Sequence, residues 1–245
     1  MTDITMAGTF RLADVFSKAV AIYGRRFVPF IILTMIASIP DYIALWVTGF
    51  PSERPDPASF TPGRIGLNLV DFATKSLASS AMIYGVVQDL RGRTFSVADS
   101  IQIALGRFLP MLGVAICTTL AIACGFALLI VPGLILGCMY YVAMPVCVAE
   151  RVGVFASISR SSFLTKGYRW QVFGMFLLIL AGGLVLGTIV GMVFALTGQI
   201  GLLISSQALG AIVSSFNGVL ISVFYYELRV AKEGIDIDKI ASVFD

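Results

Sequence analysis

The sequence predicts an all-α integral membrane protein with six transmembrane helices, arranged as three hairpins that each follow an amphipathic interfacial helix on the cytoplasmic side. Three observations indicate this fold class: the composition, the long apolar runs and a recurring short phrase. Of the 245 residues, 58% are hydrophobic and 13% are charged, whereas a soluble globular chain has roughly 45–50% apolar and about 25% charged residues. A water-soluble domain of this length needs far more surface charge, so that class is excluded.

Apolar runs long enough to cross a bilayer, which takes about 20 residues, account for the six helices. They lie at about 27–50, 65–88, 109–131, 133–149, 170–196 and 203–228. Only Val131, Pro132 and Gly133 separate the third run from the fourth, which predicts a tight helical hairpin there. Pro29 and Pro40 predict a kink or an early end in the first run.

The basic residues set the expected orientation, because cytoplasmic loops of membrane proteins carry an excess of Lys and Arg. Most of the 17 Lys and Arg residues lie before the first run, between the second and third, between the fourth and fifth, or after the sixth. Only Arg54 and Arg64 lie on the opposite side. Both termini are therefore expected to face the cytoplasm.

A short phrase recurs along the chain, as FRLADVFSKAV at 10–20 and FSVADSIQIAL at 95–105, with a weaker copy at 152–166. Each copy gathers apolar residues on one helical face and precedes an apolar run, which is typical of a helix lying on the membrane surface. Asp14 and Asp99 are expected to face water. The repetition predicts a single polytopic domain, 1–245, of three parallel units. The units span about 10–88, 95–149 and 152–228, and a short cytoplasmic tail follows at 229–245.

Small residues in the last two runs predict close helix packing, because backbones can approach in lipid where side chains are small. They are Gly183, Gly187 and Gly191 in the fifth run, and Gly210, Ser214 and Gly218 in the sixth. We expect them to hold the third hairpin together, and oligomerisation through the glycine face is the alternative.

Three charged residues, Asp41, Asp71 and Lys75, lie inside the first two runs. Asp41 and Lys75 are expected at similar depth in antiparallel helices, so they can form an ion pair. Asp71 and Lys75 are four residues apart and therefore share one helical face. Either the trio neutralises itself and pins the two helices together, or it lines a cavity for a solute, an ion or a lipid headgroup.

The sequence offers little support for catalysis or for a cofactor. Histidine is absent, which excludes histidine triads and histidine metal sites. No nucleophile, base and orienting group occur at a recognisable spacing. We therefore expect no enzyme activity, no metal and no cofactor. The basic residues do not form a patch with interleaved aromatic residues, so nucleic acid is not expected as a partner.

The stretch 131–173 carries a recognisable pattern. Pro132 and Gly133 open a run, Ala143, Met144, Pro145 and Glu150 close it, and a Ser-x-x-Leu-x-Lys-Gly element at 161–167 precedes Trp170. The pattern resembles a broad group of bacterial six-span proteins that includes the membrane domain attached to some glycerophosphoryl diester phosphodiesterases. The resemblance implies an architecture in the inner (cytoplasmic) membrane but no activity. In those fused proteins the phosphodiesterase is a separate soluble domain with its own His, Glu and metal ligands.

Two further expectations concern this stretch. Pro145 should kink the fourth run near Tyr141, because proline leaves a carbonyl without its helical donor. The basic residues that follow form a possible surface for anionic lipid headgroups or a cytoplasmic partner. They are Arg151, Arg160, Lys166 and Arg169. The alternative is an ordinary basic loop with a local Glu150–Arg151 pair.

Together these features favour a non-catalytic polytopic membrane module that binds lipid or a protein partner in envelope or membrane homeostasis. The alternative is a small transporter or channel that uses Asp41, Asp71 and Lys75. The expected partners are membrane lipids, with a protein partner or a second copy of the chain as further candidates.

Overall fold

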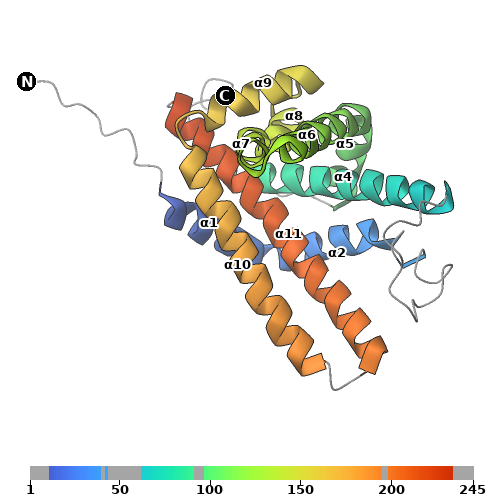
Figure 1. Cartoon of the computed structure of the whole chain (residues 1–245). Helices are drawn as coiled ribbons and strands as arrows, with labels where there is room; N and C mark the ends of the chain where they lie inside the picture. The colour runs from blue at the N-terminus through green and yellow to red at the C-terminus, as the bar shows by residue number, and fades with distance from the viewer. Residues whose placement is uncertain (1–10, 40–41, 44–61, 91–96, 195–197, 234–245) are drawn as a thin grey trace, which may run out of the picture.

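The computed structural model describes residues 11–39, 42–43, 62–90, 97–194 and 198–233, and its elements in these ranges are all helices (Figure 1). In chain order they are α1 (Leu12–Arg25), α2 (Phe27–Ala37), α4 (Pro62–Leu90), α5 (Val97–Gly106), α6 (Phe108–Leu128), α7 (Ile130–Tyr140), α8 (Ala143–Ala149), α9 (Val154–Thr165), α10 (Arg169–Phe194) and α11 (Gly198–Glu233). The all-α fold class is thereby confirmed for the described part of the chain.

Several helices are long and apolar enough to cross a membrane. Four segments meet this condition: Phe108–Leu128, Ile130–Ala149, Arg169–Met192 and Gln207–Glu233. The pair α1 and α2 meets it jointly despite an 84° bend, which makes five. The second predicted run falls in α4, which is not among these helices; Asp71 and Lys75 lie within it. The described residues thus show a membrane protein with four or five candidate spans.

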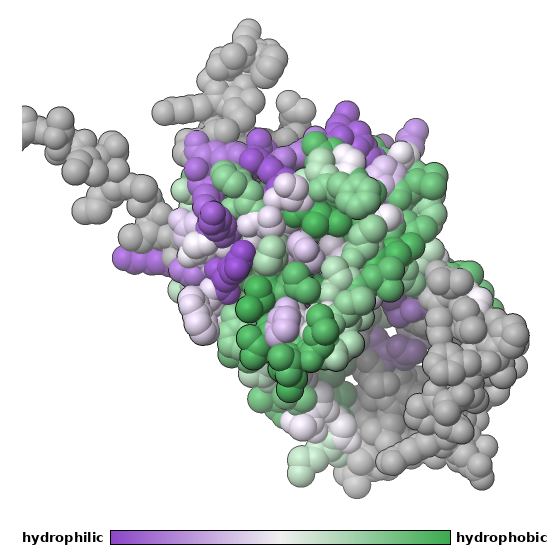
Figure 2. Space-filling model, turned by 45° about the horizontal axis from the view of Figure 1, so that its top comes forward, coloured by the Kyte–Doolittle hydropathy of each residue, from purple (hydrophilic) through white to green (hydrophobic). Residues whose placement is uncertain are grey.

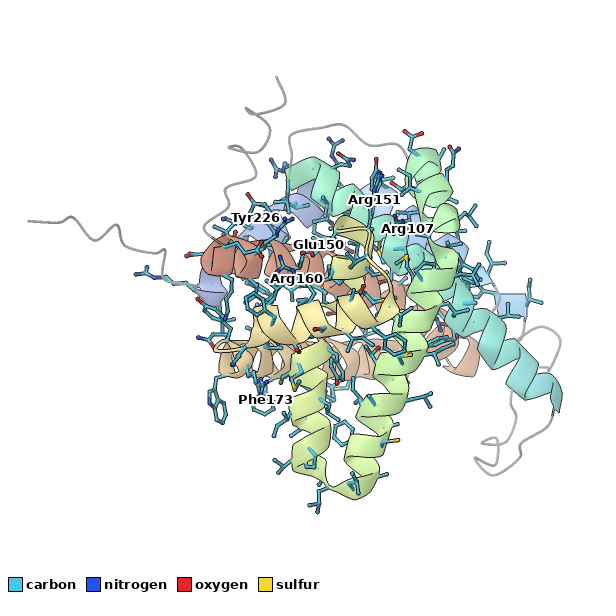
Figure 3. All side chains as sticks on the ribbon, turned by 90° about the horizontal axis from the view of Figure 1, so that it is seen from above. Arg107, Glu150, Arg151, Arg160, Phe173 and Tyr226 are labelled. Atoms are coloured by element: carbon cyan, nitrogen blue, oxygen red, sulfur yellow. The ribbon has the colours of Figure 1, made fainter. Side chains whose placement is uncertain are left out.

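The helical hairpins leave a shared core in different directions. In Figure 1, α10 and α11 run side by side in the plane of the picture, whereas α6 and α7 are seen almost end-on. Seen from above, α6 and α7 project as a separate pair (Figure 3). The third pair is α2 and α4, which pack against each other. Because the pairs diverge, the α6–α7 hairpin and α10 do not pack along their full lengths.

The shared core gathers side chains from α1, α2, α4, α5, α8, α9, α10 and α11. Its largest fully buried members include Phe30, Leu33, Leu164 and Phe224. Because lipid tails are as apolar as these side chains, van der Waals contacts rather than removal from water hold such a core together in a membrane. The short helices α1, α5 and α9 each come directly before a long apolar segment, at the places that the recurring phrase predicts.

α1 buries one face, and the aspartates of α1 and α5 that were expected to face water are exposed. Val15, Ala19 and Ile22 of α1 are buried, and Asp14 on the other side is exposed. Asp99 in the first turn of α5 is also exposed.

The turn between α6 and α7 lies earlier than predicted. Leu129 separates the two helices with extended backbone, at φ −165° and ψ 157°. Pro132 lies in the first turn of α7, where a missing N–H costs nothing because that N–H has no helical acceptor. Gly133 faces Gly125 across the hairpin, and a Cβ on Gly125 would lie 2.9 Å from the Cα of Gly133. A glycine pair thus lets the two backbones of the second hairpin approach closely.

The glycine row of α10 does not make the close contacts predicted for it. A Cβ added to Gly183, Gly187, Gly191 or Gly210 would meet no atom of the described residues within 4 Å. Gly218 is the exception, and its close neighbour is the Met82 side chain of α4 rather than α10. Ser214 is exposed. Small residues permit a close approach without enforcing it, and close packing through this glycine row stays a prediction.

The fourth span breaks where Pro145 predicts. α7 ends at Tyr140 and α8 begins at Ala143, because Pro145 has no N–H to donate to the carbonyl of Tyr141. All of α8 except Met144 and Ala149 is buried. The break therefore turns the chain into the core.

The carbonyl of Met139, which this break leaves near the end of α7, is satisfied by α9. It accepts hydrogen bonds from Ser161 Oγ at 2.8 Å and from Thr165 Oγ1 at 3.3 Å. Both side chains are fully buried, and both belong to the 161–167 element. The element thus has a structural role, because its hydroxyls fix α9 against the broken span.

Replacing Ser161 with Ala and Thr165 with Val together should lower the free energy of unfolding by about 1–3 kcal/mol, because it leaves a buried carbonyl without a donor. The thermal midpoint of the purified protein in neutral detergent measures this loss. Ser159→Ala is the matched control, because Ser159 is exposed on the same helix. Equal midpoints for the double variant and the control would contradict this role.

Candidate functional site

The charged trio predicted for the first hairpin is described only in part, because Asp41 lies outside the described residues. Lys75 Nζ lies 2.7 Å from Asp71 Oδ2, and the two side chains are 53% and 25% exposed. Neither Asp71 nor Lys75 lines the two cavities beside α7 and α10 or the small polar pocket at the end of α4. The Asp41–Lys75 pair and the transporter interpretation therefore stay predictions.

A charged network joins α8, α9 and α11, and it consists of Glu150, Arg160, Arg229 and Glu233 with Tyr225. Arg160 Nε donates to both carboxylate oxygens of Glu150, at 3.0 and 3.2 Å, and Arg160 Nη2 donates to Glu233. Arg229 Nε donates to the other oxygen of Glu233 at 3.0 Å. Tyr225 Oη donates to Glu150 at 3.0 Å. The network fastens the end of α11 to α9 and to the end of α8.

Arg160, one member of the predicted headgroup or partner surface, binds two carboxylates of its own chain. Glu150 pairs with Arg160 instead of Arg151, and a role of Arg160 toward lipid stays a prediction. Burial by itself lowers the pKa of Arg160, but the hydrogen bond with Glu233 and the charge of Glu150 outweigh it and raise that pKa above its ordinary value. The other members of the predicted surface, Arg151, Lys166 and Arg169, are exposed.

Further ion pairs hold α1 against α4 and α11. Lys18 Nζ lies 2.5 Å from Glu227 Oε1. Arg26 Nε lies 3.0 Å from Asp89 Oδ1, and Arg25 Nη2 lies 3.6 Å from Asp89 Oδ2. Figure 2 shows most hydrophilic residues of this face along its top and left, a few more at lower right beside the grey atoms, and hydrophobic residues over much of the area between.

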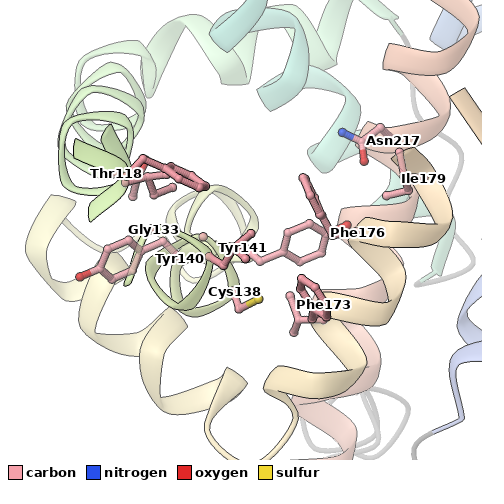
Figure 4. Close-up of a pocket in the computed structure, with 14 residues that line it drawn as sticks. Thr118, Gly133, Cys138, Tyr140, Tyr141, Phe173, Phe176, Ile179 and Asn217 are labelled. Atoms are coloured by element: carbon pink, nitrogen blue, oxygen red, sulfur yellow. The ribbon is translucent and has the colours of Figure 1, made fainter. Parts of the chain in front are cut away.

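A cavity of about 340 Å³ lies between the α6–α7 hairpin and the α10–α11 hairpin (Figure 4). Its walls are largely apolar. On the hairpin side they include Phe126, Gly133 and Gly137, and on the α10 side Phe173 and Phe176. The cavity exists because the two hairpins diverge, and the missing side chain of Gly137 adds to its volume.

Two polar atoms of this cavity's lining residues stand out. The hydroxyl oxygen of Tyr141 and the amide oxygen of Asn217 are buried and have no hydrogen-bond partner among the described residues. The Tyr141 ring is held edge-on by Phe224, with centroids 5.5 Å apart. A buried polar atom without a partner costs about 1–3 kcal/mol, so a ligand that hydrogen-bonds to either atom recovers that energy.

A second cavity of about 260 Å³ adjoins the first and shares Leu134, Cys138 and Phe173 with it. It follows one face of α7 and reaches Arg169 and Trp170 at the start of α10. Together the two cavities, which we call the interhairpin groove, run from an exposed cation to two buried polar atoms. The lining of this second cavity is wholly apolar, so Arg169 contributes only the carbon part of its side chain to it. Such a groove suits an acyl chain, and the exposed charge of Arg169 beside it suits an anionic head.

The described residues contain no group of three metal-ligating side chains that could hold an ion, and the four cysteines are free thiols. Sequence reasoning missed Gly137, Tyr141 and Asn217 as lining residues. A signal existed for Asn217, since an amide in an apolar span marks a functional position more often than not. Tyr141 was expected only as the position of the kink.

Comparison of the chain with models of protein families, with curated proteins and with solved structures found no significant match.

Proposed function

We propose that this protein is a non-catalytic polytopic membrane module that binds a membrane lipid in the interhairpin groove. The observation that carries the proposal is the apolar cavity of about 340 Å³ lined by Tyr141 and Asn217, whose buried polar atoms have no partner. An acyl chain fills the apolar part of such a groove, and an ester carbonyl or hydroxyl of the same lipid can bond to the two polar side chains. Arg169 then lies where the anionic head emerges.

The proposal includes the six-span topology and its orientation in a bacterial inner membrane. α2 and α4 form the first hairpin, α6 with α7–α8 the second, and α10 with α11 the third. The 36 residues of α11 extend over about 54 Å, at 1.5 Å per residue, whereas the hydrocarbon core measures about 30 Å. The charged end of α11 therefore projects into the cytoplasm beside α1 and α9, which lie at the interface with α5.

Filling the groove tests the proposal directly. A Cβ on Gly137 meets nothing within 4 Å, so Gly137→Phe places a ring in the cavity without displacing a neighbour. We expect phospholipid retained by the purified protein, measured by native mass spectrometry in neutral detergent, to fall about tenfold, which corresponds to 1.4 kcal/mol of binding energy.

Gly182→Phe is the matched control, because Gly182 also has open space around its Cα and lies outside both cavities. The control should retain lipid as the unmodified protein does. Retention by Gly137→Phe at the control level, or no retained lipid in the unmodified protein, would show that the groove does not bind lipid.

A further inference from the structure

A small polar pocket of about 100 Å³ lies away from the interhairpin groove, where the end of α4 meets α5 and the turn between α8 and α9. Its polar lining residues are Tyr84, Gln88, Arg107 and Arg151, and Val87, Ile103, Val148 and Ala149 complete its walls. None of these residues lines the groove. The pocket is therefore a separate site.

Two arginines reach this pocket from different parts of the chain. Arg107 stands directly before α6, at its N-cap, and Arg151 follows α8 in the turn that leads to α9. Figure 3 shows Arg107 and Arg151 near one another, on the side of Glu150 away from Arg160. Among the described residues, neither guanidinium has a carboxylate within ion-pair distance, in contrast to Arg160, which has two.

The lining residues supply no acidic side chain to compensate the two positive charges. Glu150, the neighbour of Arg151 in the chain, is already bound by Arg160 and Tyr225. The pocket therefore has an unbalanced charge of +2. Two like charges in one pocket repel each other, and an anion between them removes that repulsion.

The third polar group of the pocket also lacks a partner. The amide oxygen of Gln88 is buried and accepts no hydrogen bond from the described residues. Turning the amide by half a rotation exchanges its oxygen for its NH₂ group, because the two ends have the same shape. Gln88 can then donate to an anion, or in its other orientation accept from a protonated one.

The backbone of the turn presents Arg151 at an energetic cost. Arg151 has φ 55°, the only positive φ of a residue other than glycine in the described part of the chain. A side-chain-bearing residue in this left-handed region costs of order 1–3 kcal/mol, and such strain gathers at binding sites. Here the turn directs Glu150 toward Arg160 while Arg151 lines the pocket.

We propose that this pocket binds a phosphate group through Arg107, Arg151 and Gln88. Guanidinium groups match phosphate oxygens in charge and in the geometry of paired hydrogen bonds. A volume of about 100 Å³ equals roughly three water molecules at about 30 Å³ each, which suits one phosphate group and is too small to enclose a whole nucleotide. The phosphate belongs either to an anionic lipid headgroup or to a soluble phosphate compound, and the experiment separates these two sources.

The test uses the full chain in an uncharged detergent and measures its thermal midpoint with two probes. The first probe is inorganic phosphate against chloride at equal ionic strength, and the second is phosphatidylglycerol against phosphatidylcholine in mixed micelles. At saturation we expect a rise of about 2–4 °C with at least one probe. A rise with inorganic phosphate identifies a soluble phosphate as a ligand, whereas a rise with phosphatidylglycerol alone identifies the lipid headgroup.

Gln88→Glu is the decisive variant. It places a carboxylate in the pocket that the two arginines line, so it should keep or raise the midpoint without ligand and abolish the rise with either probe. Arg107→Gln should also abolish the rise in the thermal midpoint. If Arg107→Gln does not fold, the response of Gln88→Glu alone tests the proposal. Lys166→Gln is the control for net charge, since Lys166 is exposed and lies outside the pocket, and it should respond as the unmodified protein does.

Two outcomes overturn the proposal: no response of the unmodified protein to either probe, or an equal response from Gln88→Glu. The test is independent of the proposed function, because Gly137→Phe should keep this phosphate response while losing groove lipid.

Discussion

Replacing Gly125 with leucine should lower the free energy of unfolding by about 3 kcal/mol, the upper end of the usual range for overpacking. A Cβ at this position would lie 2.9 Å from the Cα of Gly133 and 3.1 Å from its backbone nitrogen. A backbone cannot rotate out of the way as a side chain can, so α6 and α7 must separate. The thermal midpoint in neutral detergent measures the loss, and limited proteolysis at the α6–α7 turn should become faster.

Gly137→Ala provides the matched control for this prediction. Gly137 lies on α7 as Gly133 does, but a Cβ there meets nothing within 4 Å. Alanine also has the higher helix propensity, by about 1 kcal/mol, so the control should be as stable as the unmodified protein or more so. If Gly125→Leu and Gly137→Ala had the same midpoint, the two helices would not be packed through Gly125 and Gly133.

The comparison of Gly125 with the α10 glycines shows what spacing can and cannot predict. The row Gly183, Gly187 and Gly191 has the ideal four-residue spacing, yet the described residues leave it open. Gly133 and Gly137 also have this spacing, yet the close contact of Gly133 is with Gly125, because Leu129 reverses the chain halfway between Gly125 and Gly133. Tight packing depends on which faces the turns bring together, and that information lies in the turn geometry rather than in either helix.

Local features were predicted well where one residue determines the outcome. Pro145 breaks its helix because it lacks an N–H, and no distant contact can restore that hydrogen bond. The short helices before the long apolar segments follow from period and composition in the same way. The sequence predicts the turn between the third and fourth runs at 131–133, whereas the structure has it at Leu129. Pro132 is tolerated in the first turn of a helix as readily as in a loop, so it does not distinguish the two positions.

The candidate sites depend on contacts between distant segments, and this is why the sequence gives only part of them. Arg160 and Arg151 are indistinguishable as basic residues of one loop. The structure separates them, because Glu233 lies 73 residues from Arg160 and reaches it only through the course of α11. The interhairpin groove likewise arises from the divergence of two hairpins, each of which is predicted from its own apolar runs.

The charged network has the second large expected effect. Arg160→Met removes the cation shared by Glu150 and Glu233, so both carboxylates lose a partner while they stay largely shielded, with side chains 14% and 16% exposed. Removing one partner of a buried ion pair costs about 3–5 kcal/mol, and the 28% exposure of Arg160 reduces this, so we expect a loss of roughly 2–3 kcal/mol. Methionine keeps much of the volume of the side chain, which separates the loss of charge from the loss of packing.

Arg25→Met is the control that isolates the effect of burial. Arg25 also belongs to an ion pair, but its side chain is 68% exposed, it lies 3.6 Å from Asp89, and Asp89 keeps Arg26 at 3.0 Å. Exposed pairs contribute about 0–1 kcal/mol, so this variant should unfold within a degree or two of the unmodified protein. Thermal midpoints of the two variants in the same detergent measure the difference. A loss in Arg160→Met as small as that in Arg25→Met would mean that the network does not hold the end of α11 to α9. In that case the apolar core alone would hold these helices together. Glu150→Gln should then change the thermal midpoint as little as Arg25→Met does.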